Sequence, residues 1–185
     1  LECHDLCCMI AKVIVVGGVR RSALISLSNP SDDRLRGAKS GNFGLLHSER
    51  YLANNSACYT EKPEFGFFLK EMVALHESYS GERGVFSRVA AQKIAARNGR
   101  RESEHDFGTN PCSEIILRPN QFCNLTEVVI RAEDTLETLC EKVKIATILG
   151  TLQSTLTDFR YLRKIWKTNT EEEALLGVSL TGIMD

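Results

Sequence analysis

The sequence predicts an α/β fold in which short strands alternate with helices around a largely parallel sheet or barrel. Two observations carry this prediction: short runs of branched apolar residues alternate with longer amphipathic segments, and glycine-rich turns separate the two kinds. The 185 residues are 43% hydrophobic and 25% charged, which suffices for one sizeable core. No internal repeat or low-complexity linker divides the chain, so residues 1–185 are expected to form a single domain.

The first half of the chain is expected to hold two helices and two strands. Residues 3–16 mix cysteines with branched apolar side chains, which predicts a mostly buried helix, or a helix that runs into a strand. Gly17–Gly18 ends it, and the branched run 23–27 predicts a buried strand. Capping and turn residues then introduce a short polar helix over 32–39, and 53–59 is a second strand.

The second half is expected to be more helical. Apolar residues that recur at three and four positions predict an amphipathic helix over 63–78, and a small-residue face predicts another over 89–98. A tight loop then leads into the apolar strand 115–117. The longest helical pattern covers 135–158 and is expected to bend or break near Gly150.

The charge and cysteine content exclude several classes of protein. A formal net charge of -1 and a pI near 6.5 leave no basic surplus for a nucleic acid polymer. No stretch is long and apolar enough for a membrane span, and none is typical of a signal peptide, so a cytoplasmic protein is expected. The seven cysteines are odd in number and irregularly spaced, which disfavours a secreted disulfide framework.

The N-terminal cluster of Cys3, His4, Cys7 and Cys8 is the nearest approach to a metal site. By their spacing of four, Cys3 and Cys7 would share one helix face, and His4 and Cys8 another. A structural zinc ion needs four ligands in one closed set. We therefore favour packing of these cysteines as small apolar residues, and we expect no metal ion.

A five-residue motif, Asn110-Pro111-Cys112-Ser113-Glu114, carries the candidate chemistry. An amide, a thiol and a carboxylate stand at alternate positions, and in an extended segment alternate side chains point to the same side. Pro111 fixes its own φ and restricts Asn110, which stiffens the loop beside the thiol. Taken alone, such a motif is more often a turn with a buried cysteine and a solvated glutamate.

Further segments change that reading. The string GTNPCSEI at 108–115 resembles the finger-loop signature of ribonucleotide reductases, and Cys123 looks like the second cysteine of their reducing pair. Three other segments are similar, in the family's order, to the adenosylcobalamin-dependent branch of that family; they lie at 52–57, 80–86 and 176–183. The resemblance covers essentially the whole chain.

This resemblance implies a fold, an activity and roles for four residues. The fold would be part of a ten-stranded α/β barrel with a central cysteine-bearing finger loop. The activity would be reduction of ribonucleoside triphosphates to deoxyribonucleotides by thiyl-radical chemistry, with adenosylcobalamin as radical generator. Cys112 would carry the radical, Glu114 would accept a proton and Asn110 would hold the substrate. Cys123 would supply a reducing equivalent, restored by a thioredoxin-like dithiol.

The glycine-rich basic segment before the first strand is similar to the family's specificity loop. The resemblance implies that this loop relays the identity of a bound deoxynucleotide effector, whereas by itself it could be a solvated turn. Its residues are Gly17, Gly18, Val19, Arg20, Arg21 and Ser22. The expected partners are therefore a ribonucleotide substrate, the effector and the dithiol, without nucleic acid polymer or membrane.

Several alternatives stay open. The chain opens at Leu1 and ends after an apolar, glycine-containing run, so both ends are interpreted as cuts and the chain as a middle slice of the barrel. The partner of Cys123 is then expected before Leu1. A diiron-dependent ribonucleoside-diphosphate reductase shares the Asn, Cys and Glu arrangement. A cysteine hydrolase with His105 as the base, or a catalytically silent nucleotide-binding module, would also fit the motif taken alone.

Overall fold

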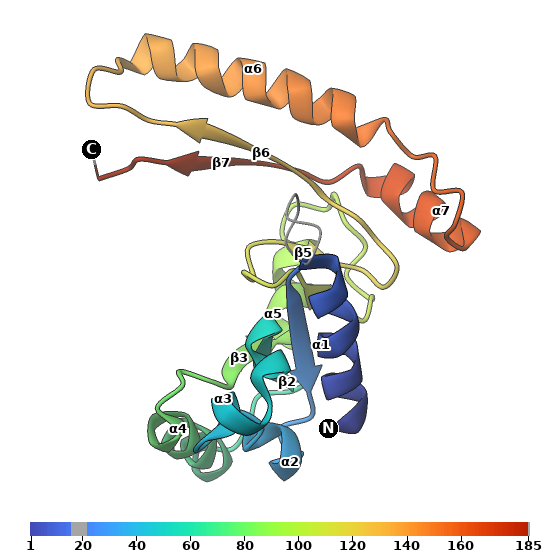
Figure 1. Ribbon diagram of the computed structural model, residues 1–185. Helices are drawn as coiled ribbons and strands as arrows, with labels where there is room; N and C mark the ends of the chain where they lie inside the picture. The colour runs from blue at the N-terminus through green and yellow to red at the C-terminus, as the bar shows by residue number, and fades with distance from the viewer. Residues whose placement is uncertain (16–21, 185) are drawn as a thin grey trace. The chain divides into compact units, whose positions relative to one another are not determined.

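The computed structural model describes residues 1–15 and 22–184 (Figure 1). Contacts group the chain into two compact units, Leu1–Ile116 and Leu117–Asp185. The single domain expected from the sequence stays a prediction, and each unit is described by itself. No helix in the described residues is long and apolar enough to cross a membrane.

The first unit contains a three-stranded parallel sheet. Its strands are β1 (Leu24–Ser28), β2 (Ala53–Tyr59) and β3 (Gly84–Ser87), in the order β1-β2-β3, so β2 is the central strand. Leu24 pairs with Ala53, and Ser56 pairs with Gly84. The predicted strands at 23–27 and 53–59 are confirmed, and the parallel pairing confirms the predicted α/β class. The closed ten-stranded barrel stays a prediction.

Six helical segments accompany this sheet in the described part of the first unit. They are α1 (Glu2–Val15), α2 (Asp33–Arg36), α3 (Phe43–Leu46), the 3-10 helix η1 (Ser48–Leu52), α4 (Phe65–Ser78) and α5 (Arg88–Ala96). Side-chain caps start two of them: Asp32 accepts from the N–H of Leu35 at 3.0 Å, and Ser87 accepts from that of Ala90 at 3.2 Å. Such caps satisfy amides that have no partner within the first helical turn. The predicted helices over 63–78 and 89–98 are confirmed.

Helix α1 differs from its prediction in burial. Cys8 and Ala11 are buried, where the helix contacts β1 and η1. Five of its other apolar side chains are exposed, with relative accessibilities between 55% and 73%: Leu6, Met9, Ile10, Val13 and Ile14. The expectation of a mostly buried helix is therefore wrong for the described chain, because only one side of α1 has packing partners there.

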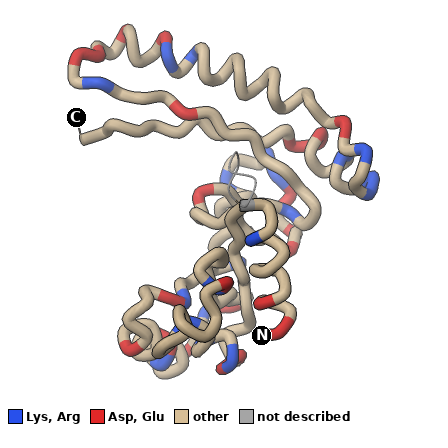
Figure 2. The backbone as a smooth tube through the Cα atoms, in the orientation of Figure 1, with Lys and Arg blue, Asp and Glu red and all other residues tan. Residues whose placement is uncertain are grey.

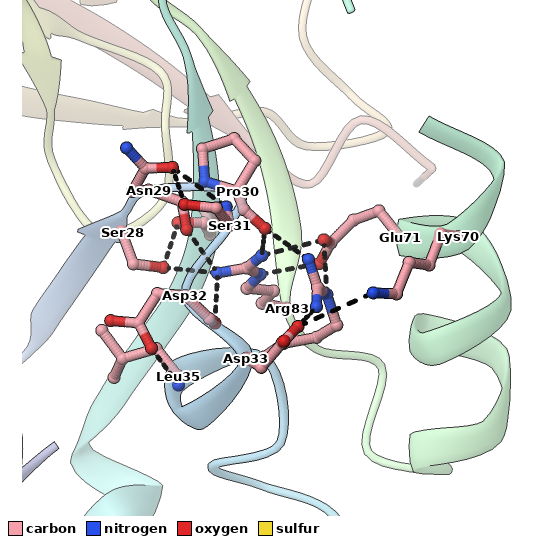
Figure 3. Close-up of polar contacts among 12 residues, drawn as sticks. Ser28, Asn29, Pro30, Ser31, Asp32, Asp33, Leu35, Lys70, Glu71 and Arg83 are labelled. Carbon is pink, nitrogen blue, oxygen red and sulfur yellow. Dashed lines mark hydrogen bonds and ion pairs between the residues drawn. The ribbon is translucent and has the colours of Figure 1, made fainter. Parts of the chain in front are cut away.

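A buried ion cluster fixes the turn that follows β1 (Figure 3). Arg83 and Glu71 are 2% and 1% exposed, and the guanidinium donates to the two carboxylate oxygens at 2.7 and 2.8 Å. Arg83 also donates to the Ser28 hydroxyl at 2.8 Å and to the Pro30 carbonyl at 2.8 Å. Arg36 adds a second cation, 3.0 Å from Glu71. The cluster thus joins β1, α2, α4 and the start of β3.

Opposite charges also meet beside the central strand. Arg50 donates to both carboxylate oxygens of Asp5, at 2.7 and 2.6 Å, and Lys39 lies 2.9 Å from Glu82. Lysines and arginines are interspersed with acidic residues along each unit (Figure 2). Because Arg50 and Lys39 are themselves buried, these pairs satisfy charges that would otherwise be costly to bury.

The second unit is a parallel strand pair with a helical crossover. Strand β6 (Asn124–Val129) pairs with β7 (Leu176–Thr181), from Asn124 with Leu176 to Val129 with Thr181. Helices α6 (Leu136–Ser154) and α7 (Lys164–Glu173) lie between them in the chain, and α6 packs along both strands (Figure 1). Helix α6 runs through Gly150 without interruption, so the break predicted there is absent.

Gly150 is the point where α6 comes closest to the strands. A Cβ atom added there would lie 2.2 Å from Leu176 Cδ1 and 3.2 Å from Thr126 Cγ2. The glycine therefore serves close packing of the helix on the strand pair, which explains how α6 tolerates it.

We expect Gly150→Leu to destabilise the second unit by roughly 1–3 kcal/mol, because overpacking outweighs the helix propensity gained. Hydrogen exchange of the β6 amides measures this loss. The matched control is Gly66→Leu in α4, where an added Cβ meets no atom within 4 Å. If the β6 amides exchanged more slowly in Gly150→Leu than in the wild type, the packing role of Gly150 would be contradicted.

Candidate functional site

The candidate loop lies between two short paired strands, β4 (Gly108–Thr109) and β5 (Ile116–Leu117). Three hydrogen bonds close it. The carbonyl of Ile115 accepts from the Thr109 hydroxyl at 2.9 Å and from the Asn110 N–H at 3.3 Å. The N–H of Ile115 in turn donates to Asn110 Oδ1 at 3.1 Å. Residues 110–115 therefore form a closed loop with its own internal bonds.

Within this loop the chain turns tightly. The N–H of Ser113 donates to the carbonyl of Asn110 at 2.9 Å, and Ser113 has a φ of 65°, in the left-handed region. The extended conformation that we assumed for the alternate positions is therefore wrong. A turn was the better expectation, because Pro111 presets the φ of a turn's second residue.

The three predicted catalytic side chains lie on this loop. Cys112 and Glu114 are exposed, so the cysteine is not the buried residue of an ordinary packed turn. Glu114 has no hydrogen-bond or ion-pair partner within the described chain, which leaves its carboxylate available as an acceptor. Asn110 is half-buried and uses Oδ1 inside the loop, while its Nδ2 donor has no partner among the described residues. The loop thus presents a thiol, a carboxylate and an amide donor.

Asn54 supports the loop from outside; it lies in the 52–57 segment that carries the resemblance, but no role was predicted for it. Its Nδ2 donates to the carbonyl of Pro111 at 2.8 Å, and it stands near the start of β2. Fifty-seven positions separate the two residues, so no local pattern could have indicated the contact.

Two other cysteines differ from Cys112 in their surroundings. Cys8 and Cys58 are buried, and burial raises the pKa of both thiols, which makes them poor thiolates. Cys8 Sγ lies 3.9 Å from His4 Nδ1, but a fully buried thiol is closed to substrates. This cysteine–histidine contact therefore gives no support to a hydrolase.

The N-terminal cysteine cluster does not converge on a metal site. Cys3 and Cys7 are exposed whereas Cys8 is buried, so their sulfur atoms face different surroundings. The two ring nitrogens of His4 are each 3.0 Å from an oxygen, one of Asp5 and one of Asn55. The predicted packing as a small apolar residue is confirmed for Cys8 and is wrong for Cys3 and Cys7, because the exposed side of α1 carries them.

Cys123, the predicted redox cysteine, is half-buried just before β6 in the second unit. Both neighbours are tied to the crossover: the N–H of Phe122 donates to Thr170 Oγ1 at 3.2 Å, and that of Asn124 to the Leu175 carbonyl at 2.9 Å. The role of Cys123 as the second cysteine of the reducing pair stays a prediction.

The predicted specificity loop falls almost wholly outside the described residues. Gly17, Gly18, Val19, Arg20 and Arg21 lie there, and only Ser22 is described, as a half-buried residue before β1. Its role in effector binding stays a prediction.

A cavity of about 650 Å³ opens at the carboxyl ends of β1 and β2. It is lined by residues 29–30, by 58–64 and by Phe67. Asn54 lies at the other end of β2, so the cysteine loop meets the strand away from this cavity.

Comparison with known proteins gives a consistent result. No family model and no solved structure matches the chain. The adenosylcobalamin-dependent ribonucleoside-triphosphate reductase of Lacticaseibacillus paracasei is 30% identical over 191 residues, and that of Levilactobacillus brevis 30% over 189. The reductase of the same name from Lactobacillus leichmannii is 28% identical over 203 residues.

Each alignment covers 100% of this chain but only 24% of the relative, so the chain spans about a quarter of these reductases' length. The same name is carried by relatives from Lactobacillus acidophilus and Lactobacillus gasseri, at 30% and 31% identity. The chain is therefore related, over its whole length, to the adenosylcobalamin-dependent ribonucleoside-triphosphate reductases.

Proposed function

We propose that the chain is part of an adenosylcobalamin-dependent ribonucleoside-triphosphate reductase, which converts ribonucleotides to 2′-deoxyribonucleotides. The observation that supports this most directly is the exposed thiol of Cys112, flanked by the donor of Asn110 and the carboxylate of Glu114. It stands in a chain that aligns from end to end with reductases of that name.

The residues of the loop would divide the reaction between them. A thiyl radical at Cys112 removes the hydrogen atom from C3′ of the ribose, which restores the thiol and leaves a carbon radical. Glu114 accepts the proton of the 3′-hydroxyl, and Asn110 donates a hydrogen bond that holds the substrate. The 2′-hydroxyl then leaves as water with a proton from the reducing thiols. Once the substrate is reduced, Cys112 returns its hydrogen atom to C3′, which regenerates the thiyl radical.

Cys123 would provide one of the two thiols whose electrons replace the 2′-hydroxyl by hydrogen. The pair ends as a disulfide, which thiol exchange with a thioredoxin-like dithiol reduces again. The sequence expectation that its partner lies before Leu1 belongs to this proposal.

Bound adenosylcobalamin would supply the initial radical. To receive that radical, the Cys112 thiol would have to be accessible to the cofactor. The thiol is exposed in the first unit, which fits this requirement. We assign none of the described residues as a cobalamin ligand. The same proposal makes the two parallel sheets parts of a ten-stranded barrel, with the 17–22 segment as the loop that senses a deoxynucleotide effector.

The experiment is an assay of deoxynucleotide formation by the protein that carries this chain at its full natural length. Ribonucleoside triphosphate, adenosylcobalamin and a dithiol are supplied together, and each is then omitted in turn. Product that requires all three supports the proposal. Activity that ignores cobalamin but accepts diphosphates would favour the diiron-dependent class, and hydrolysis of a substrate without reduction would favour a hydrolase.

We expect Cys123→Ser to abolish multiple turnover, because serine cannot form the disulfide that carries the two electrons. Product per enzyme, followed over time with excess dithiol, should stay well below one, since the first turnover already needs this pair. The control is Cys140→Ser, an exposed cysteine on α6 of the same unit, which should turn over normally. Sustained turnover by Cys123→Ser would remove Cys123 from the reducing pair.

A further inference from the structure

The tip of the cysteine loop has one anchor outside itself. Among the described residues, positions 111–114 take part in two hydrogen bonds: the turn bond from Ser113 to Asn110, and the bond from Asn54 Nδ2 to the Pro111 carbonyl at 2.8 Å. Proline has no N–H, so this carbonyl is the only polar backbone group that Pro111 offers. The carbonyl oxygen is therefore the one backbone atom of Pro111 to which an external group can hydrogen-bond, and Asn54 donates to it.

The residue that provides this anchor stands on a well-fixed part of the first unit. β2 is the central strand, and Asn54 pairs with Ile25 of β1. On the next residue, the N–H of Asn55 donates to Glu82 at 2.9 Å, and its side chain lies 3.0 Å from His4. The start of β2 is thus hydrogen-bonded to α1 and to the segment before β3. The backbone that carries Asn54 is therefore fixed, and so is the donor that contacts the loop.

We propose that Asn54 is a positioning residue for Cys112. This inference rests on the proposed function, in which Cys112 carries the radical. Pro111 directly precedes Cys112, so a shift of the Pro111 carbonyl moves the sulfur atom relative to the substrate. Small displacements of a reacting group lower the rate steeply, and a misplacement of about 1 Å can cost on the order of 100-fold.

The geometry separates positioning from support of the fold. Asn54 is exposed, and an exposed hydrogen bond adds little to stability because water replaces it readily. Loss of the donor should therefore appear in kcat, whereas the folded structure and the KM for the nucleotide remain close to those of the wild type.

The test compares two variants that separate donor from shape. Asn54→Asp keeps the shape but has no donor at neutral pH, and Asn54→Gln keeps an amide donor on a longer side chain. We expect Asn54→Asp to lower kcat about tenfold or more with KM within about twofold, and Asn54→Gln to retain most of the activity. Asn98→Ala, at an exposed asparagine after α5, is the control and should match the wild type.

Wild-type kcat in Asn54→Asp would overturn the proposal, as would a larger loss in Asn54→Gln than in Asn54→Asp. A second readout is independent of reduction: the rate of Cys112 alkylation by iodoacetamide, followed by mass spectrometry. We expect Asn54→Asp to change this rate and Asn54→Gln to restore it. If the wild type makes no deoxynucleotide, the proposed function fails, and the alkylation rates alone decide whether Asn54 positions the loop; equal rates in all variants would overturn that.

Discussion

Replacement of Cys112 by serine is expected to abolish deoxynucleotide formation, to below about one-thousandth of the wild-type rate. The reason is chemical: an O–H bond is much stronger than an S–H bond, so a serine radical is not formed under conditions that form a thiyl radical. The structure adds that the side chain is exposed and that no described residue donates to or accepts from it. The loop should therefore keep its shape, and nucleotide binding should persist. The measurement is product formation in the complete assay, with equilibrium binding of the triphosphate beside it.

The control for this variant is Cys3→Ser, which changes an exposed cysteine of the same unit, on α1. It should leave turnover and binding unchanged. Full reductase activity in Cys112→Ser would show that the radical is carried elsewhere. Loss of binding together with activity would instead show that Cys112 supports the loop, and would leave its chemical role without evidence.

Local patterns were sufficient for much of the first unit. The strand over 53–59 and the helix over 63–78 follow from side-chain alternation and periodicity, which depend on neighbouring residues only. The strands β3, β6 and β7 were not predicted. Their sequences, such as Asn124–Val129, place polar residues among apolar ones, and they become strands by pairing with partners far along the chain.

The same limit applies to the candidate site. The Asn, Cys and Glu motif located the loop, because it needs only adjacent residues. Its turn at Ser113, the bond from Asn54 and the burial of Glu71 against Arg83 all depend on tertiary contacts. Exposure of α1 could not be predicted either, since its apolar residues match those of a buried helix.

Glu71→Gln is expected to produce the largest loss of stability in the first unit. The carboxylate is 1% exposed and receives hydrogen bonds from Arg83 at 2.7 and 2.8 Å and from Arg36 at 3.0 Å. Glutamine has nearly the same shape but no charge, so the buried guanidinium of Arg83 loses its counterion, and the half-buried guanidinium of Arg36 keeps only Asp33. Removal of one partner of a buried pair costs about 3–5 kcal/mol. Hydrogen exchange of the amides in β1 and α4 measures the loss, because the cluster joins these two elements.

The effect should also depend on pH in a defined direction. Burial by itself raises the pKa of Glu71, but the hydrogen bonds from Arg83 and Arg36 outweigh it and hold the pKa below the ordinary value of 4.5. A carboxyl group whose folded-state pKa is lowered stabilises the fold above its unfolded-state pKa, and this contribution is lost as the pH falls through the folded-state pKa. The difference between wild type and Glu71→Gln should therefore be constant near neutral pH and become smaller below 4.5.

The neighbouring residue provides the control. Lys70 is 65% exposed and lies 3.9 Å from Asp33, so Lys70→Gln should change the stability by less than about 1 kcal/mol. Lys70 and Glu71 are adjacent on α4 but differ in burial (Figure 3). A larger loss of stability in Glu71→Gln would therefore be due to the buried charge. If Glu71→Gln were as mild as Lys70→Gln, the carbonyl groups of Asn29 and Pro30 would suffice to hold Arg83, and the turn after β1 would not need the carboxylate.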